Sequence, residues 1–178
     1  GGSVAMTAAR LDASRLRAVV LVDVAGRVDP GVGTVIVDSL RRLGRTYQSR
    51  EHYLAEVGSQ GLVEPWNEYW DRAYTYDLDH IEGGVAVRTS AEAVAEDRAY
   101  TATQHPYDRW RHLTMPTLLV RATRELRAGA GHVVPSEDCD RFLREVPKAT
   151  VVEVDGNHLT VNTHPATGEA IHSFLTTP

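Results

Sequence analysis

Residues 151–158 read VVEVDGNH, and they combine three signals that decide how the chain folds. The three valines favour an extended strand because branching at Cβ restricts their side-chain rotation. Asp155 to Asn157 have the chemistry of a tight turn, since glycine and asparagine adopt positive φ at little cost. The turn leaves His158 on a loop just after the strand, where open α/β sheets carry their working groups. The alternative is a histidine that only caps the loop.

Two earlier segments have the pattern of buried strands. Residues 18–22 are apolar without alternation and end on Asp23, and residues 115–122 are similar, with a proline near their start. Helices are expected after the second and third strands, at about 136–145 and 165–175. This alternation indicates a parallel α/β sheet, but three strands are too few for an ordinary open sheet and indicate half of a domain.

The segment between the first two strands differs in composition. All three tryptophans and all seven tyrosines lie between Tyr47 and Trp110. Repeated helix starts and glycine stops predict a mainly helical segment here. We therefore expect core segments at 1–33 and 113–178 on either side of a helical insertion at 34–112.

Composition limits the class of function. The 178 residues are enough for a sizeable core, and the net charge of -5 argues against an extended nucleic-acid surface. The apolar runs are far shorter than the roughly 20 residues of a membrane span. A single cysteine, Cys139, excludes an intrachain disulfide and a cysteine-based zinc site. The histidines other than His158 show no metal-ligand spacing, so no metal is expected. Because of the net charge and the short apolar runs, neither a nucleic acid nor a membrane is expected as a partner.

In order and spacing, these segments resemble the C-terminal half of the α/β-hydrolase fold. Gly1 and Gly2 look like the residues that follow the nucleophile in the Gly-x-Ser-x-Gly-Gly elbow of these enzymes. Residues 18–23 resemble the sixth sheet strand, 115–125 the seventh strand with its acid loop, and 151–158 the eighth strand with its histidine loop. The aromatic middle resembles the inserted cap. The resemblance implies an α/β fold: the C-terminal half of a parallel sheet with a helical cap insertion.

The resemblance also implies parts that this chain does not contain. They are a nucleophile two residues before Gly1, five further strands and an oxyanion-hole segment. Without those strands, residues 18–22 would form an exposed apolar sheet edge, which is an aggregation hazard. We therefore expect the N-terminal half of the same hydrolase, as a separate chain, to be the partner. No cofactor is implied, and the cytoplasm is the expected location, with any signal lying upstream of residue 1.

The resemblance assigns roles to single residues. His158 is the expected general base, because an imidazole exchanges protons near neutral pH. The acid that orients it is expected to be Glu125, at the position the family most often uses, with Asp23 as the second candidate. Glu125 could instead be a solvated loop residue, and Asp23 a carboxylate that only binds loop amides. Gly1 and Gly2 are expected to support the oxyanion at the start of their helix, or to allow close packing there.

The aromatic residues of the insertion are expected to roof a substrate pocket or, alternatively, to form the core of the lid. The residues concerned are Trp66, Tyr69, Trp70, Tyr74 and Tyr76. The main expectation is a serine hydrolase that cleaves an ester, thioester or lactone of a hydrophobic small molecule through an acyl-enzyme. Two alternatives stay open: an enzyme with an aspartate nucleophile, as in epoxide hydrolases and dehalogenases, and a non-catalytic binding member of the fold.

Overall fold

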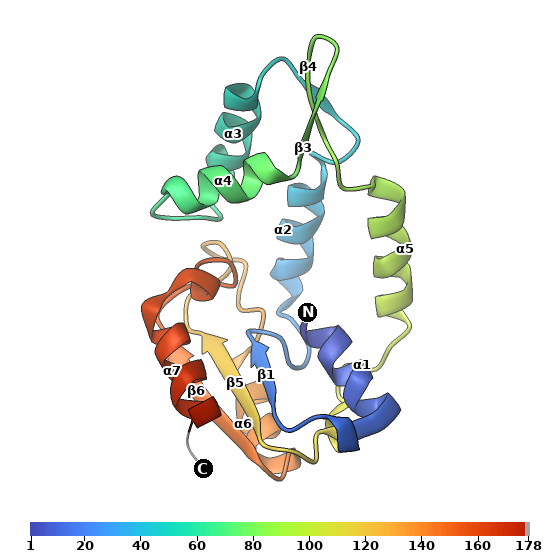
Figure 1. The fold of residues 1–178 in the computed structure, drawn as a ribbon, viewed down its shortest axis with the longest axis vertical. Helices are drawn as coiled ribbons and strands as arrows, with labels where there is room; N and C mark the ends of the chain where they lie inside the picture. Colours follow the sequence, from blue (N-terminus) through green and yellow to red (C-terminus); the bar gives the residue numbers. More distant parts are fainter. Residues whose placement is uncertain (177–178) are drawn as a thin grey trace. The chain divides into compact units, whose positions relative to one another are not determined.

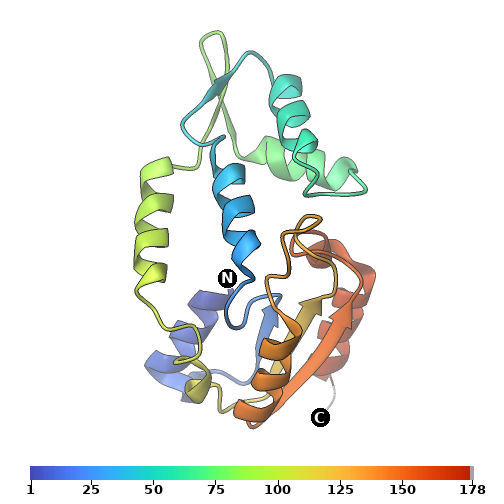
Figure 2. The same ribbon diagram turned by 180° about the vertical axis from the view of Figure 1, so that it is seen from behind.

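The computed structural model describes residues 1–176, and this part of the chain divides into two compact units. The first unit takes in residues 1–33 and the chain from His105 onward, and the second takes in residues 34–104. Figure 1 and Figure 2 show the ribbon from opposite sides, coloured along the sequence. The insertion therefore ends before residue 112, where the sequence placed its end. Residues 105–112 belong to the first unit because Trp110 is buried in that unit's core.

A parallel sheet in the order β1-β5-β6 forms the centre of the first unit. Its strands are β1 (Val19–Val22), β5 (Thr117–Ala122) and β6 (Ala149–Val154). Every residue of β5 is buried, including the polar Thr117 and Arg121, as expected for a central strand with both faces covered. The carboxyl ends of parallel strands meet at one edge, so the loops that begin after these three strands are neighbours.

Strand β1 lies at the edge of the described sheet. It pairs with β5 on one side, with Leu21 beside Leu119, and the described residues place no strand on its other side. An open groove of about 1010 Å³ lies on one face of the sheet, and its lining includes Leu118, Val152 and Phe174. The first unit therefore carries an open strand edge and a partly uncovered apolar face.

Helices pack on both faces of this sheet, as the ribbon in Figure 1 shows. The helical elements of the unit are α1 (Gly2–Asp12), η1 (Ala13–Arg15), η2 (Trp110–His112), α6 (Ser136–Glu145), η3 (Thr160–Thr163) and α7 (Pro165–Thr176). On one face, α1 and α6 contribute Met6 and Phe142 to a core that includes Leu119. On the other face, α7 packs against Leu118 and Val120. These two clusters hold the strands in a single layer.

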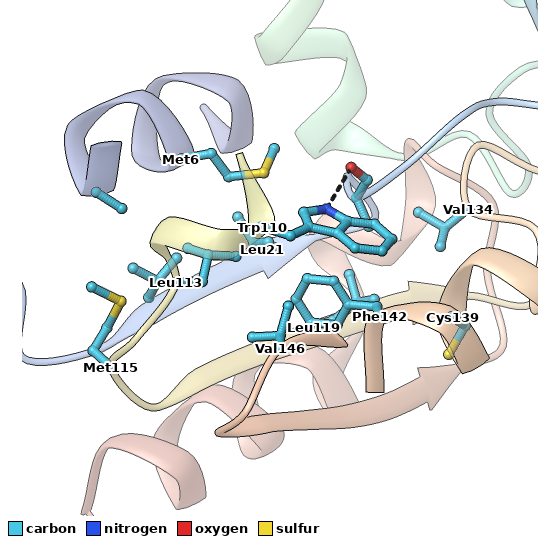
Figure 3. Close-up of a cluster of buried hydrophobic side chains, with 13 residues drawn as sticks. Met6, Leu21, Trp110, Leu113, Met115, Leu119, Val134, Cys139, Phe142 and Val146 are labelled. Atoms are coloured by element: carbon cyan, nitrogen blue, oxygen red, sulfur yellow. Dashed lines mark hydrogen bonds between the residues drawn. The ribbon is translucent and has the colours of Figure 1, made fainter. Parts of the chain in front are cut away.

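The indole of Trp110 fills the centre of the first cluster (Figure 3). It meets the ring of Phe142 edge to face, with ring centroids 5.2 Å apart. Its buried N–H donates to the backbone oxygen of Ala25, at 3.3 Å. Cys139 lies in the same cluster as a free, buried thiol, and burial raises its pKa. The tryptophan thus joins the sheet, α6 and the loop after β1.

The second unit combines helices with an antiparallel sheet in the order β2-β4-β3. Its elements are β2 (Thr46–Tyr47), α3 (Arg50–Ser59), α4 (Glu68–Tyr76), β3 (Leu78–Ile81), β4 (Gly84–Val87) and α5 (Ala91–Ala102), and α2 (Pro30–Leu40) spans the boundary with the first unit. The expectation of a mainly helical insertion was therefore incomplete. Gly83, with φ of +80°, makes the turn between β3 and β4, which form a β-hairpin.

Three helices of this unit begin at side-chain caps. Ser49 accepts a hydrogen bond from the His52 N–H, Asn67 from the Tyr69 N–H, and Ser90 from the Ala93 N–H. Helices α5 and α7 have 12 residues each. Among residues 1–176, no helix has both the length and the apolar character that crossing a bilayer requires.

We expect truncation of the central strand to be costly. Leu119→Ala removes a fully buried side chain and leaves a cavity, so the free energy of unfolding should fall by about 2–5 kcal/mol. The matched control is Leu143→Ala on the exposed side of α6, expected to change it by less than about 0.5 kcal/mol. Urea denaturation monitored by tryptophan fluorescence measures both, and equal effects would contradict the proposed core.

Candidate active site

Asp23 and His158 form a hydrogen-bonded pair at the carboxyl edge of the sheet. Asp23 directly follows β1 and is 1% exposed, and its Oδ2 lies 3.0 Å from Nδ1 of His158. Its Oδ1 accepts the N–H of Ala122 at 2.9 Å. Because an ionised carboxylate can only accept, Nδ1 of the histidine carries the hydrogen and Nε2 is left with a free lone pair in the neutral ring. The pair therefore has the geometry of a base and its orienting acid.

The backbone at Asp23 adopts a conformation that side chains rarely take. Its φ is +49°, and among the described residues it is the one non-glycine with positive φ. Its N–H donates to the oxygen of Val120 at 2.7 Å, so the residue still follows the edge of β5. Strain of this kind persists at functional sites where the surroundings fix it.

The loop that carries His158 is held by its own side chains. Oδ1 of Asn157 accepts the N–H groups of Leu159 and Thr160, each at 3.0 Å, and the Asn157 N–H donates to Oγ1 of Thr160 at 2.9 Å. Neither Gly156 nor Asn157 has positive φ, contrary to the expected turn. Space at the glycine is tight instead, since a Cβ there would lie 3.0 Å from Oγ1 of Thr160 and this neighbour would have to shift slightly. The turn after β6 is thus an asparagine-centred loop.

Glu125, the favoured acid in the sequence, does not contact His158. Its Oε2 accepts the N–H of Gly129 at 2.7 Å, and the side chain is exposed. Gly129, with φ of +75°, turns the loop back so that the carboxylate closes its own loop. The structure thus pairs the histidine with Asp23, the second candidate, and not with Glu125, and the role of Asp23 as the orienting acid stays a prediction.

The loop after β5 supports the histidine loop. The N–H of Arg124 donates to the oxygen of Gly156 at 2.9 Å. Its guanidinium forms a bidentate pair with Asp155, both contacts at 2.6 Å. This pairing lowers the pKa of Asp155 and raises the pKa of Arg124. Nδ2 of Asn157 adds a bond to the oxygen of Leu126 at 3.2 Å. The strand–turn signal at 151–158 predicts the loop but not these partners.

The loop after β5 is also joined to the loop after β1. Asp29 donates its N–H to the oxygen of His132 at 3.0 Å and accepts the His132 N–H on Oδ2 at 2.7 Å. Gly131 lies against the same carboxylate, where a Cβ would collide with Asp29. No local pattern in the sequence predicts this pair, because its members are about 100 residues apart.

Gly2 is packed closely against the segment after β1. A Cβ on Gly2 would lie 2.8 Å from Cγ1 of Val24, whereas one on Gly1 would meet nothing within 4 Å. The close-packing alternative therefore holds at Gly2. The oxyanion role of Gly1 and Gly2 stays a prediction.

Four of the five expected substrate-binding aromatics pack together within the second unit, where Tyr69 meets Trp70 edge to face with ring centroids 5.0 Å apart. Trp66 stacks on Tyr74 with ring centroids 5.5 Å apart, and Trp70 is buried beside Tyr74. Trp66 and Tyr74 also pack against the unit's core of buried residues, so the lid-core alternative holds for them. Tyr69 and Tyr76 are exposed. Contact of any of the five with a substrate stays a prediction. Within residues 1–176, no group of three His, Cys, Asp or Glu side chains is arranged to hold a metal ion.

No protein-family model and no curated protein matches the chain. Among solved structures it is similar to E-2-(acetamidomethylene)succinate hydrolase, with a TM-score of 0.76 and 20% identity over 97% of this chain and 62% of that one. It is also similar to the enol-lactonase from Burkholderia xenovorans LB400 (TM-score 0.64, 19% identity, 99% and 62% covered). A third is the thioesterase domain from the curacin biosynthetic pathway (0.62, 15%, 99% and 62%). The chain thus spans less than two thirds of each of these proteins.

The Arg124–Asp155 pair predicts a measurable titration. In the folded protein the pKa of Asp155 should lie below its ordinary value of 3.8, because the guanidinium stabilises the carboxylate. A lowered pKa means that the pair stabilises the fold above the unfolded-state pKa and loses this contribution as pH falls through the folded-state value. NMR titration of the Asp155 carboxyl carbon measures the pKa.

The pKa of Asp155 should rise in Arg124→Gln and stay unchanged in Arg144→Gln, a matched change at an exposed position on α6. An unaltered titration in Arg124→Gln would contradict the assigned pairing.

Proposed function

We propose that this chain, which has the α/β-hydrolase fold and corresponds to its C-terminal half, supplies the general base and acid of a serine hydrolase. The observation that carries the proposal is the hydrogen bond between Asp23 and Nδ1 of His158 at the carboxyl edge of the sheet. The proposed nucleophile is a serine two residues before Gly1. The fold alone does not decide function, so the proposal depends on this geometry.

In the proposed mechanism, His158 transfers protons through Nε2. The imidazole takes the proton of the serine hydroxyl as the serine attacks an acyl carbon, and then gives the proton to the leaving group. Asp23 holds Nδ1–H, which fixes the tautomer and stabilises the imidazolium that forms. Water then attacks the acyl-enzyme while His158 takes its proton, and the imidazole gives that proton to the serine oxygen as the acid is released. Backbone N–H groups at the start of α1, near Gly1 and Gly2, are proposed to support the oxyanion.

The proposal requires a segment that precedes residue 1 and continues the sheet. The open edge of β1 supports such a segment, because a strand added there would pair with its free backbone groups. The groove beside α7 also supports such a segment. Its lining does not include Asp23 or His158, so the segment could cover the groove without blocking the proposed site. On α1, Val4 and Leu11 are exposed apolar side chains seven residues apart. We propose that the N-terminal half of the same hydrolase covers these surfaces.

The proposed substrate is an ester, thioester or lactone of a hydrophobic small molecule. Two of the similar structures are a thioesterase domain and an enol-lactonase, and the acyl-enzyme route suits both bond types. The aromatic side chains of the second unit support an apolar acyl or alcohol group.

A fluorophosphonate probe tests the nucleophile in the intact protein. The probe should modify one serine, located by peptide mass spectrometry two residues before Gly1, because only a serine activated by a base reacts readily. Denaturation before labelling is the control and should abolish the reaction. An unlabelled protein would contradict the serine proposal, and aspartate at the same position would favour the epoxide hydrolase and dehalogenase alternative. An unlabelled protein that binds ligand without turnover would favour the non-catalytic alternative.

Substitution of His158 and of each candidate acid tests the proposed pair. His158→Gln and Asp23→Asn should each lower kcat by roughly 10²- to 10⁴-fold, because the first removes the base and the second no longer fixes its tautomer. Glu125→Gln is the matched control and should stay within about threefold, since its carboxylate closes its own loop. Ester turnover measures all three variants. The reverse order, with Glu125→Gln inactive and Asp23→Asn active, would show that the acid is wrongly assigned.

A further inference from the structure

A buried carboxylate lies in the first unit outside the Asp23–His158 pair. Asp138, on α6, is 5% exposed. Its Oδ2 accepts the N–H of Arg27 at 2.6 Å, and its Oδ1 accepts the hydroxyl of Tyr107 at 2.8 Å. A buried charge is costly unless it is hydrogen-bonded, so the fold retains this carboxylate for the two donors that it holds.

The first of these donors belongs to the loop that follows Asp23. Arg27 lies four residues after Asp23, and Gly26 approaches so closely that a Cβ there would collide with the Asp138 carboxylate. Trp110 holds the same loop from the core, where its N–H donates to the oxygen of Ala25 (Figure 3). Two buried groups therefore fix the backbone at positions 25 and 27.

The second donor completes the support. Burial and the hydrogen bond to Asp138 raise the pKa of Tyr107, so its hydroxyl remains a donor. The guanidinium of Arg141 stacks over the Tyr107 ring, 3.8 Å from its centroid, and pairs with Glu145 at 2.6 Å. The Tyr107 ring also meets Trp110 edge to face, with centroids 4.9 Å apart. Each oxygen of the Asp138 carboxylate thus has its own donor, the Arg27 N–H for one and the Tyr107 hydroxyl for the other.

Asp23 needs such support because its own backbone is strained. Its φ of +49° is unfavourable for a residue with a side chain, and relaxation toward negative φ would turn the carboxylate away from His158. The bonds of Asp23 to Val120 and Ala122 fix it from the side of β5. The chain that leaves Asp23 is fixed through Ala25 and Arg27.

We infer that Asp138 is a positioning residue, which holds the loop after β1 so that Asp23 keeps its left-handed backbone and its hydrogen bond to His158. The inference rests on the proposed function for its effect on turnover. The effect on the histidine hydrogen bond is independent of any activity.

The decisive variant is Asp138→Leu in the intact protein. It is similar in size but leaves the Arg27 N–H and the Tyr107 hydroxyl without an acceptor, so the loop should move. We expect kcat to fall by about 10- to 100-fold with KM within about twofold, because a displaced acid affects the reacting base more than binding. The low-field proton resonance of His158 Nδ1–H, bonded to a carboxylate, should disappear.

Two further variants separate positioning from folding. In Asp138→Asn, the side-chain oxygen can accept the Arg27 N–H while the amide donates to the Tyr107 oxygen, so kcat and the resonance should be largely retained. Asp140→Leu removes an exposed carboxylate from the same helix and should leave both unchanged. If Asp138→Leu does not fold, Gly26→Ala displaces the loop through contact with the Asp138 carboxylate instead, and it should cause the same two losses.

The outcomes distinguish the inference from the proposed function. Loss of the resonance in folded Asp138→Leu or Gly26→Ala, but not in Asp140→Leu, supports positioning even if the intact protein hydrolyses no ester. An unchanged resonance in the folded variants overturns the inference, and so does a resonance that Asp138→Asn fails to retain. Lower thermal stability with an unchanged resonance would show that Asp138 only stabilises the fold.

Discussion

The carboxylate of Asp23 joins the ends of β1 and β5 to the histidine loop through its two oxygens. One oxygen accepts the N–H of Ala122, and the other faces Nδ1 of His158. The side chain is almost fully buried, and such a charge is tolerated because both oxygens have partners. The left-handed backbone is the strained feature that brings them within reach. The geometry of this edge of the sheet therefore depends on one residue in a rarely used conformation.

The loops at this edge hold one another, and side chains from distant parts of the chain make the contacts. Arg124 joins the second loop to the third, and Asp29 joins the first to the second. Asp138 ties the first loop to α6. Loops are usually the mobile part of a fold, but here each has an anchor to a loop or helix from another part of the sequence. A proposed proton-transfer pair is thereby placed on a rigid support.

The sequence predicts the strands of the first unit well, because short runs rich in valine and leucine, bounded by turn residues, leave few alternatives. It predicts His158 and both candidate acids, but not the choice between them. That choice depends on the path of each loop: Gly129 turns Glu125 onto its own backbone, whereas Asp23 points across β5. In the second unit, β2 has two residues and β3 and β4 have four each, too short to show a clear alternation, so this sheet was missed. Asp29 and Asp138 were missed because each has a backbone partner about 100 residues away, His132 for Asp29 and Arg27 for Asp138.

The reactivity of Cys139 can report the local unfolding of the first unit. This residue is the one thiol in the sequence, it is 6% exposed, and it follows Asp138 on α6. A thiol packed in a core reacts only when its helix detaches, because burial both shields it and keeps it protonated. The rate at which an alkylating reagent modifies the native protein therefore reports how often α6 opens. The chain thus carries a reporter of local unfolding beside the carboxylate that anchors the first loop, and no label has to be engineered.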